Sequence, residues 1–258
     1  MKYEFNYLVE IQYLGFRYSG WAKQPKQKTI HGFIDKTLSF VFEHDNFKTL
    51  GCSRTDSKVS ANQNFFQLFT NEAIEKESWL LSFNSNLPPD IKAISVCDVS
   101  SDFNIIKAVS HKTYEYQFSL NNKNHPFIAP YVTNHSNSLN ISLMEKGAKL
   151  FIGTHNFMNY CTELNENKQT IKTISDCAII AKKFELGSEA IDCHVLTITG
   201  NGFLRHQIRL MMAQLFLLGE GKITIQDLKQ SLEVKHPKPF RNIAPASGLT
   251  LRNVYFSR

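Results

Sequence analysis

The chain has 258 residues, of which 42% are hydrophobic and 20% charged, a composition that indicates a folded globular protein and excludes a disordered one. This length is enough for one large domain or two small ones. A formal net charge of +6 and a pI near 9.0 favour an anionic partner, with nucleic acid as the first candidate.

The cysteines and histidines are scattered along the chain. The five cysteines contain no CxxC pair, and the nine histidines form no HExxH motif or short cluster. This usage is typical of reduced thiols in a cytoplasmic protein, and it predicts neither a disulfide framework nor a metal site. No apolar run approaches the length needed to cross a bilayer, so we expect no membrane partner.

The first half of the chain predicts alternating strands and helices. Aromatic and β-branched residues indicate a strand, whereas apolar residues at helical spacing after Thr29 indicate a helix. The expected elements are a strand at 4–13, a helix from 29 to 43, strands at 47–52 and 65–69, a helix at 72–83 and a strand at 91–99. Their order, β-α-β-β-α-β, is that of the split βαβ or ferredoxin-like arrangement.

The second half predicts roughly the same order with insertions. The expected elements are a strand at 113–120, a loop at 121–138, a helix at 141–151, strands at 170–183 and 191–199, helices at 203–218 and 224–232, and a strand at 249–256. We therefore predict two related α+β halves with a cleft between them. A boundary near residues 101–106 divides the chain into 1–103 and 104–258.

A polar turn at Gly51–Val59 separates two strand-like segments and contains Arg54 and Asp56. A carboxylate in such a turn can project into a cleft, and the neighbouring arginine can hold an anionic backbone. The arginine would keep Asp56 ionised, which favours a nucleophile or base over a proton donor. The alternative is a surface turn that only reverses the chain.

Arg205 and Arg209 are four residues apart and would share one face of the predicted helix at 203–218. Like charges at this spacing repel each other, so an acidic group or a phosphate is expected to face them. The alternative is a solvated basic stripe opposite an apolar core face. In the strand at 113–120, Tyr114 could offer a ring for base stacking, although strand tyrosines are more often core residues.

These segments, in this order, resemble motifs of the TruA-type pseudouridine synthases, enzymes that isomerise uridine in transfer RNA. The resemblance runs nearly end to end. It rests on Tyr13-Leu14-Gly15 with Tyr18-Ser19-Gly20-Trp21, on Gly51–Val59, on Asn84–Ile91, on Lys112–Tyr116, on Phe203–Arg209 and on Gly248-Leu249.

The resemblance implies a role for each matching residue. Asp56 matches the catalytic aspartate, Arg209 the arginine that pairs with it, and Tyr114 the tyrosine that packs on the target base. Arg54 would occupy the space that the flipped uridine leaves, and Leu249 would line the base pocket. We assign two further cations, Lys58 and Arg205, to substrate binding.

The resemblance also implies an architecture. Two ferredoxin-like halves would form one continuous antiparallel sheet with a central basic cleft, and the protein would act as a homodimer on RNA, by default the anticodon arm of tRNA. No cofactor is needed for this reaction.

Several positions depart from the family pattern. Lys58 replaces a glycine, which puts in doubt a backbone conformation that glycine favours. Ile106 replaces a basic residue expected to contact RNA, and Leu14 stands where an aspartate is usual. These departures favour one alternative, a non-catalytic RNA-binding or RNA-folding protein on the same scaffold. A third interpretation, from outside RNA, is a ferredoxin-like interaction or small-anion-binding protein.

Overall fold

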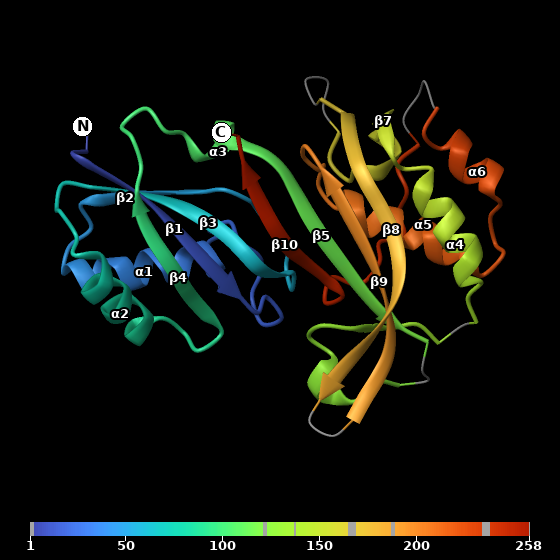
Figure 1. Cartoon of the computed structure of the whole chain (residues 1–258), viewed down its shortest axis with the longest axis horizontal. Helices are drawn as coiled ribbons and strands as arrows, with labels where there is room; N and C mark the ends of the chain where they lie inside the picture. The colour runs from blue at the N-terminus through green and yellow to red at the C-terminus, as the bar shows by residue number, and fades with distance from the viewer. Residues whose placement is uncertain are drawn as a thin grey trace. The chain divides into compact units, whose positions relative to one another are not determined.

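The computed structural model describes residues 3–120, 123–136, 138–164, 169–186, 189–233 and 238–257. The described residues form an α+β protein in which a large, mostly antiparallel sheet is accompanied by helices (Figure 1). The chain divides into two compact units, Met1–Ser110 with Leu251–Arg258, and His111–Thr250. The predicted α+β class is therefore confirmed, whereas the functional boundary at 103/104 stays a prediction.

The first unit contains the β-α-β-β-α-β order that the sequence predicts. Its elements are β1 (Phe5–Tyr13), α1 (Ile30–Phe42), β2 (Phe47–Gly51), β3 (Ser60–Thr70), α2 (Lys76–Asn86) and β4 (Ile91–Asp98), followed by the short helix α3 (Ile105–Ala108). Strand β1 lies between β3 and β4 and is antiparallel to both, and β2 pairs antiparallel with β3. The hydrogen-bonding order is thus β4-β1-β3, with β2 also on β3.

Every second side chain of β1 is buried and contributes to the core of this unit. Tyr7, Val9, Ile11 and Tyr13 are all buried, because successive side chains of a strand point to opposite faces. Helix α1 begins where predicted, since the Thr29 side chain accepts a hydrogen bond from the Gly32 backbone N–H. Its buried apolar residues are Ile30, Ile34 and Leu38.

The predicted helix at 72–83 is displaced, because α2 runs from Lys76 to Asn86. The Glu75 carboxylate accepts hydrogen bonds from the backbone N–H groups of Glu77 and Ser78, which fixes the helix start after it. The preceding Ile74 N–H instead donates to the Tyr7 hydroxyl. A side-chain cap four residues into the expected helix therefore set its beginning.

The remaining elements belong mainly to the second unit. They are β5 (Val109–Ser119), the 3₁₀ turn η1 (Pro126–Ile128), β6 (Thr133–Asn134), α4 (Ile141–Lys149), β7 (Gly153–Asn156), η2 (Met158–Tyr160), β8 (Ile171–Leu186), β9 (Glu189–Gly200), α5 (Gln207–Gly219), α6 (Ile225–Gln230) and β10 (Leu249–Phe256), most of which lies in the first unit. Strand β9 is antiparallel to β5 and β8, and β7 is antiparallel to β8. Strands β5 and β10 contribute residues to both units.

The sequence missed several short elements of this unit. The segment predicted as loop contains η1 and β6, and β6 pairs parallel with β5. Residues 121, 122 and 137 of that loop lie outside the described residues, as do residues 234–237 between α6 and β10. None of the helices in the described part of the chain is long and apolar enough to cross a membrane.

Helix α5 is the buried helix of the second unit, with apolar residues on nearly all sides. It packs tightly on α4, because a Cβ atom on Gly147 would lie 2.4 Å from the Leu218 side chain. The predicted start at Phe203 is wrong. His206 takes a left-handed backbone conformation with φ 61°, and the Leu204 N–H donates to the Gln207 side chain, so residues 203–206 form a turn.

Candidate active site

The loop between β2 and β3 contains Arg54, Asp56 and Lys58. Its side chains alternate in burial, since Ser53 and Thr55 are buried whereas Arg54 and Lys58 are exposed and Asp56 is half-buried. The buried pair anchors the loop to the first unit, and the alternate positions face outward. This arrangement presents the Asp56 carboxylate on a fixed backbone.

A buried hydrogen-bond network fixes the inner side of this loop. The Tyr13 hydroxyl lies 2.8 Å from Thr55 Oγ1. Asn64 Nδ2 donates to the Tyr13 hydroxyl at 3.2 Å and to the Ser53 carbonyl at 3.0 Å. Burial raises the pKa of Tyr13, so its hydroxyl keeps its proton for hydrogen bonding.

Backbone hydrogen bonds from the loop after β1 fix the other side. The Trp21 N–H donates to the Thr55 carbonyl at 3.0 Å, and the Lys58 N–H donates to the Tyr18 carbonyl at 3.1 Å. The two loops approach closely at Gly20, whose φ is 97° and where a Cβ atom would lie 2.8 Å from the Thr55 carbonyl oxygen. Only glycine fits this position without strain.

Trp21 lies beneath the start of the Asp56 loop. The indole is 2% exposed, and a Cβ atom on Gly51 would lie 2.4 Å from its Nε1. The His31 ring packs beside the indole with centroids 5.4 Å apart. Burial lowers the pKa of His31, while the nearby Asp35 carboxylate opposes that shift.

Lys58 has a left-handed backbone conformation, with φ 66°. The family pattern has a glycine at this position, and glycine adopts a left-handed backbone conformation readily. The conformation is retained with a lysine in it, although this region is unfavourable for residues with a Cβ atom. The Lys58 ammonium lies 6.0 Å from the centroid of the Phe16 ring.

In the second unit, Tyr114 lies on β5 and is 8% exposed. Its ring packs edge-on against Phe203, with centroids 5.3 Å apart and planes at 82°. Tyr116, two residues further on, donates its hydroxyl proton to the Pro245 carbonyl at 2.9 Å. The strand therefore holds one aromatic ring near the turn before α5 and ties the segment at 244–249 to the sheet.

Arg209 lies in the first turns of α5 and is half-buried. Its Nε donates to the Ala244 carbonyl at 2.8 Å, and the Ala244 N–H donates back to the Arg209 carbonyl at 3.1 Å. The same segment continues to Leu249, which is buried and whose N–H donates to the Ala246 carbonyl. Segment 244–249 thus connects Arg209 with Leu249.

Arg205 does not share a helix face with Arg209, so that prediction is wrong. It lies in the turn before α5, and its guanidinium forms an ion pair with the Glu163 carboxylate. The acidic partner expected for this arginine is therefore a carboxylate of the chain itself. Both side chains are more than half exposed, so the pair contributes little to stability.

The structure brings the predicted residues together within each unit. Arg54, Asp56 and Lys58 share one loop of the first unit. In the second unit, segment 244–249 links Arg209 to Leu249. Among the described residues, no group of three or more His, Cys, Asp or Glu side chains could hold a metal ion.

Sequence reasoning missed Asn64 and Thr55, which together with Tyr13 hold the Asp56 loop. Asn64 offered one signal, because this polar residue immediately precedes Phe65-Phe66 in a strand and is fully buried. A buried amide needs hydrogen-bond partners, which predicts a network but not its members.

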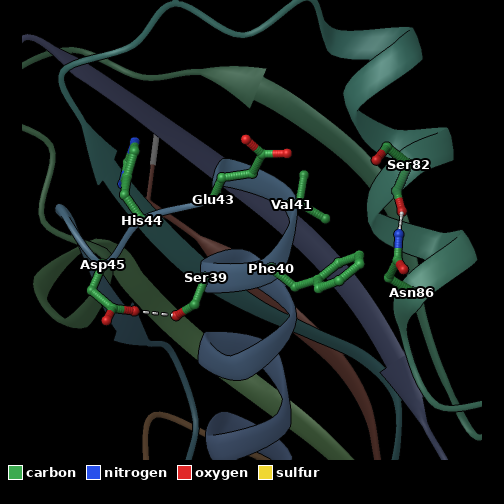
Figure 2. A pocket seen from close by; sticks show the side chains of 8 residues that line it. All are labelled: Ser39, Phe40, Val41, Glu43, His44, Asp45, Ser82 and Asn86. Carbon is green, nitrogen blue, oxygen red and sulfur yellow. Dashed lines mark hydrogen bonds between the residues drawn. The ribbon is translucent and has the colours of Figure 1, made fainter.

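A pocket of the first unit lies beside the end of α1 and is separate from these residues (Figure 2). It is lined by Ser39, Phe40, Val41, Glu43, His44, Asp45, Ser82 and Asn86. Ser39 donates to Asp45, and Asn86 donates to the Ser82 carbonyl, so these polar groups already have partners. None of the predicted site residues lines this pocket.

Comparison with known proteins places the chain in a family. A family model described as tRNA pseudouridine synthase matches residues 148–257. A protein named tRNA pseudouridine synthase A from Staphylococcus epidermidis is 32% identical over 250 residues, covering 97% of this chain and 90% of its own. Proteins of the same name from Clostridium acetobutylicum and Caldicellulosiruptor saccharolyticus are 30% and 31% identical, each covering 97% of this chain and 99% of its own. With this likeness along nearly its whole length, the chain belongs to the tRNA pseudouridine synthase family of RNA-uridine isomerases.

Proposed function

We propose that this protein converts uridine to pseudouridine in tRNA, by default in the anticodon arm, with Asp56 as the catalytic carboxylate. Family membership supports the reaction, and the relatives' name supports tRNA as the substrate. The observation that carries the assignment of Asp56 is its loop, which buried and backbone hydrogen bonds hold on two sides. A catalytic group needs such a fixed position.

The reaction exchanges one glycosidic bond for another. The bond from C1′ to N1 of the uracil breaks, a bond from C1′ to C5 forms, the C5 hydrogen leaves as a proton, and N1 gains a proton. Substrate and product are isomers, so atoms and electrons balance without a co-reactant. The proposed site therefore needs a carboxylate, a base pocket and RNA contacts.

Asp56 and Arg54 act on the nucleotide from the first unit. The uridine must leave its stack before the glycosidic bond can be reached, at a cost of a few kcal/mol. Arg54, which is exposed beside the aspartate, would occupy the vacated space and contact the backbone phosphates. Asp56 would act as a nucleophile on the nucleotide or as a base that takes a sugar proton.

The second unit would supply the base pocket. Tyr114 would pack on the uracil, Leu249 would line the pocket, and Arg209 would pair with Asp56. Support comes from the anchoring of Arg209 and Leu249 through segment 244–249. Lys58 and Arg205 would contribute to phosphate binding, and Arg205 would exchange its exposed Glu163 partner for the RNA backbone.

We extend the proposal to the architecture. Two ferredoxin-like halves, 1–103 and 104–258, would form one continuous sheet with a central basic cleft, and the active protein would be a cytoplasmic homodimer. The element order of the first unit and its strand order β4-β1-β3, with β2 on β3, support the ferredoxin-like assignment.

Nucleotide-resolution mapping of pseudouridine in a tRNA transcript tests the substrate assignment. After incubation with the purified protein, pseudouridine is expected in the anticodon arm. A control transcript in which cytidine replaces the uridines of that arm should contain no pseudouridine. Pseudouridine formed only outside the anticodon arm would refute the proposed modification site. Complete absence of pseudouridine on several tRNA transcripts would count against the activity itself.

A further inference from the structure

Phe16 and Lys58 form an exposed pair, and Lys58 is two residues from Asp56. The Lys58 ammonium lies 6.0 Å from the Phe16 ring centroid, and 39% of Phe16 is exposed. An exposed aromatic ring beside a cation is the combination that binds an unpaired nucleotide, because the ring stacks on a base and the cation contacts a phosphate.

Both residues lie on segments whose backbones are locked together. The Gly15 N–H donates to Ser60 Oγ at 3.0 Å, and a Cβ atom on Gly15 would lie 1.9 Å from the Val59 carbonyl oxygen. The Lys58 N–H bonds to the Tyr18 carbonyl. Phe16 and Lys58 are therefore flanked by fixed contacts, and they keep their relation to the Asp56 loop.

Among the described residues Lys58 forms no ion pair, so no carboxylate neutralises its charge. Arg17, beside Phe16, forms an ion pair with Asp90. Lys58 instead faces a ring, which attracts the ammonium without removing its charge. The full positive charge thus stays available to an anion.

The backbone of Lys58 gives a second, independent observation. A lysine in the left-handed region with φ 66° is strained, whereas glycine would accept the same conformation freely. Strained residues persist mainly where the surrounding structure holds them, and they gather at functional sites. Here the strained residue places a cationic side chain within the proposed catalytic loop.

We propose that Phe16 and Lys58 form a platform for an unpaired nucleotide next to the target uridine. The base stacks on the Phe16 ring and its phosphate binds the Lys58 ammonium. This inference rests on the proposed function and deepens it, because it selects RNA in which the nucleotide beside the target is single-stranded. A base inside a continuous helix has both faces covered and cannot stack on a protein ring.

The test measures binding of a tRNA transcript by Phe16→Leu, Lys58→Gln and the matched control Lys48→Gln. Lys48 is also exposed and lies 5.7 Å from a phenylalanine ring, that of Phe69. Phe16→Leu is expected to weaken binding about fivefold or more. Lys58→Gln should reduce the slope of log affinity against log salt by about one, and Lys48→Gln should leave affinity near wild type.

Lys58→Gly separates binding from folding. Glycine accepts the left-handed conformation, so this variant should not lower the melting temperature, yet it should lose as much RNA affinity as Lys58→Gln. If Lys58→Gly has a lower melting temperature but unchanged RNA affinity, the Phe16–Lys58 contact only stabilises the fold. That result would refute the proposed platform.

The outcomes also separate this inference from the proposed function. If the wild type forms pseudouridine while Phe16→Leu and Lys58→Gln match its affinity and turnover, the platform alone is refuted. If the wild type neither binds nor modifies tRNA, the proposed function fails and the platform fails with it.

Discussion

Asp56 owes its position to residues that do not take part in the chemistry. Tyr13, Thr55 and Asn64 form a buried network under the loop, and the Trp21 N–H fixes the Thr55 carbonyl from the other side. Buried polar groups that lose a partner are costly, so the network favours one loop conformation. The position of the carboxylate therefore depends on hydroxyl and amide groups as well as on the backbone.

The substitution Tyr13→Phe tests this dependence, because it removes only the hydroxyl group. Removing the hydroxyl leaves Thr55 and Asn64 each without one partner, so the free energy of unfolding should fall by about 1–3 kcal/mol. Because the loop then becomes less fixed, kcat should fall more than KM rises. Urea unfolding and steady-state kinetics measure both effects. A stability loss with unchanged kcat would make the network structural only.

At the level of single residues, sequence reasoning identified outward-facing groups better than the groups that hold them. Arg54, Asp56 and Lys58 stand out as polar residues between two strands, whereas Thr55 looks like one more turn residue. The reach of Asn64 to Tyr13 depends on strand pairing between β1 and β3, which residue types do not encode locally. Likewise, nothing local to Arg205 indicates Glu163, which is 42 positions earlier.

At the scale of elements, the sequence predicted the start of some helices correctly and of others wrongly. Thr29 and Thr224 cap α1 and α6 where predicted, and Thr224 forms a capping box with Asp227. The starts of α2 and α5 were misplaced, because Glu75 and the left-handed His206 end the preceding turns. Apolar periodicity shows that a helix exists but not which side chain closes its first turn.

Thr29→Ala tests the cap of α1. The Gly32 N–H would lose its side-chain acceptor, and the free energy of unfolding should fall by about 1 kcal/mol. Thr29→Ser keeps the hydroxyl and should stay close to wild type. Thermal or urea unfolding of the three proteins gives the comparison, and an equal loss in both variants would show that the cap hydrogen bond is not the cause.

At the scale of the whole molecule, two half-buried histidines set part of the pH dependence of stability. Burial lowers the pKa of both His31 and His194 below the ordinary value of 6.5. The unfolded chain therefore binds more protons than the folded one as pH falls through this value. This contribution to stability is complete above about pH 6.5 and is lost at lower pH.

His31→Gln should accordingly flatten the fall in melting temperature between about pH 6.5 and 5. Glutamine does not titrate and can still hydrogen-bond Thr49, which lies 2.7 Å from the His31 ring nitrogen. Melting curves across this range measure the slope for the variant and the wild type. A slope as steep as that of wild type would assign the pH dependence to other groups.

The overall class was readable from the sequence because it depends on the order of elements. The β-α-β-β-α-β order of the first unit followed from alternating and helical periodicities, and β10 begins and ends where predicted. The additional strand β7 and the turn η1 did not follow, since η1 has three residues, fewer than one helical turn, and β7 has only four residues, too few for alternation to stand out. The pairing of β7 with β8 depends on contacts in the folded chain and not on local sequence.

Release of tritium from tRNA labelled at C5 of its uridines tests the central claim most directly, because formation of the C1′–C5 bond expels that hydrogen. The wild type and the exposed-aspartate control Asp102→Asn should release tritium at similar rates, whereas Asp56→Asn should be slower by about 10²-fold or more and keep its RNA affinity. Equal release by Asp56→Asn and the wild type would contradict the account.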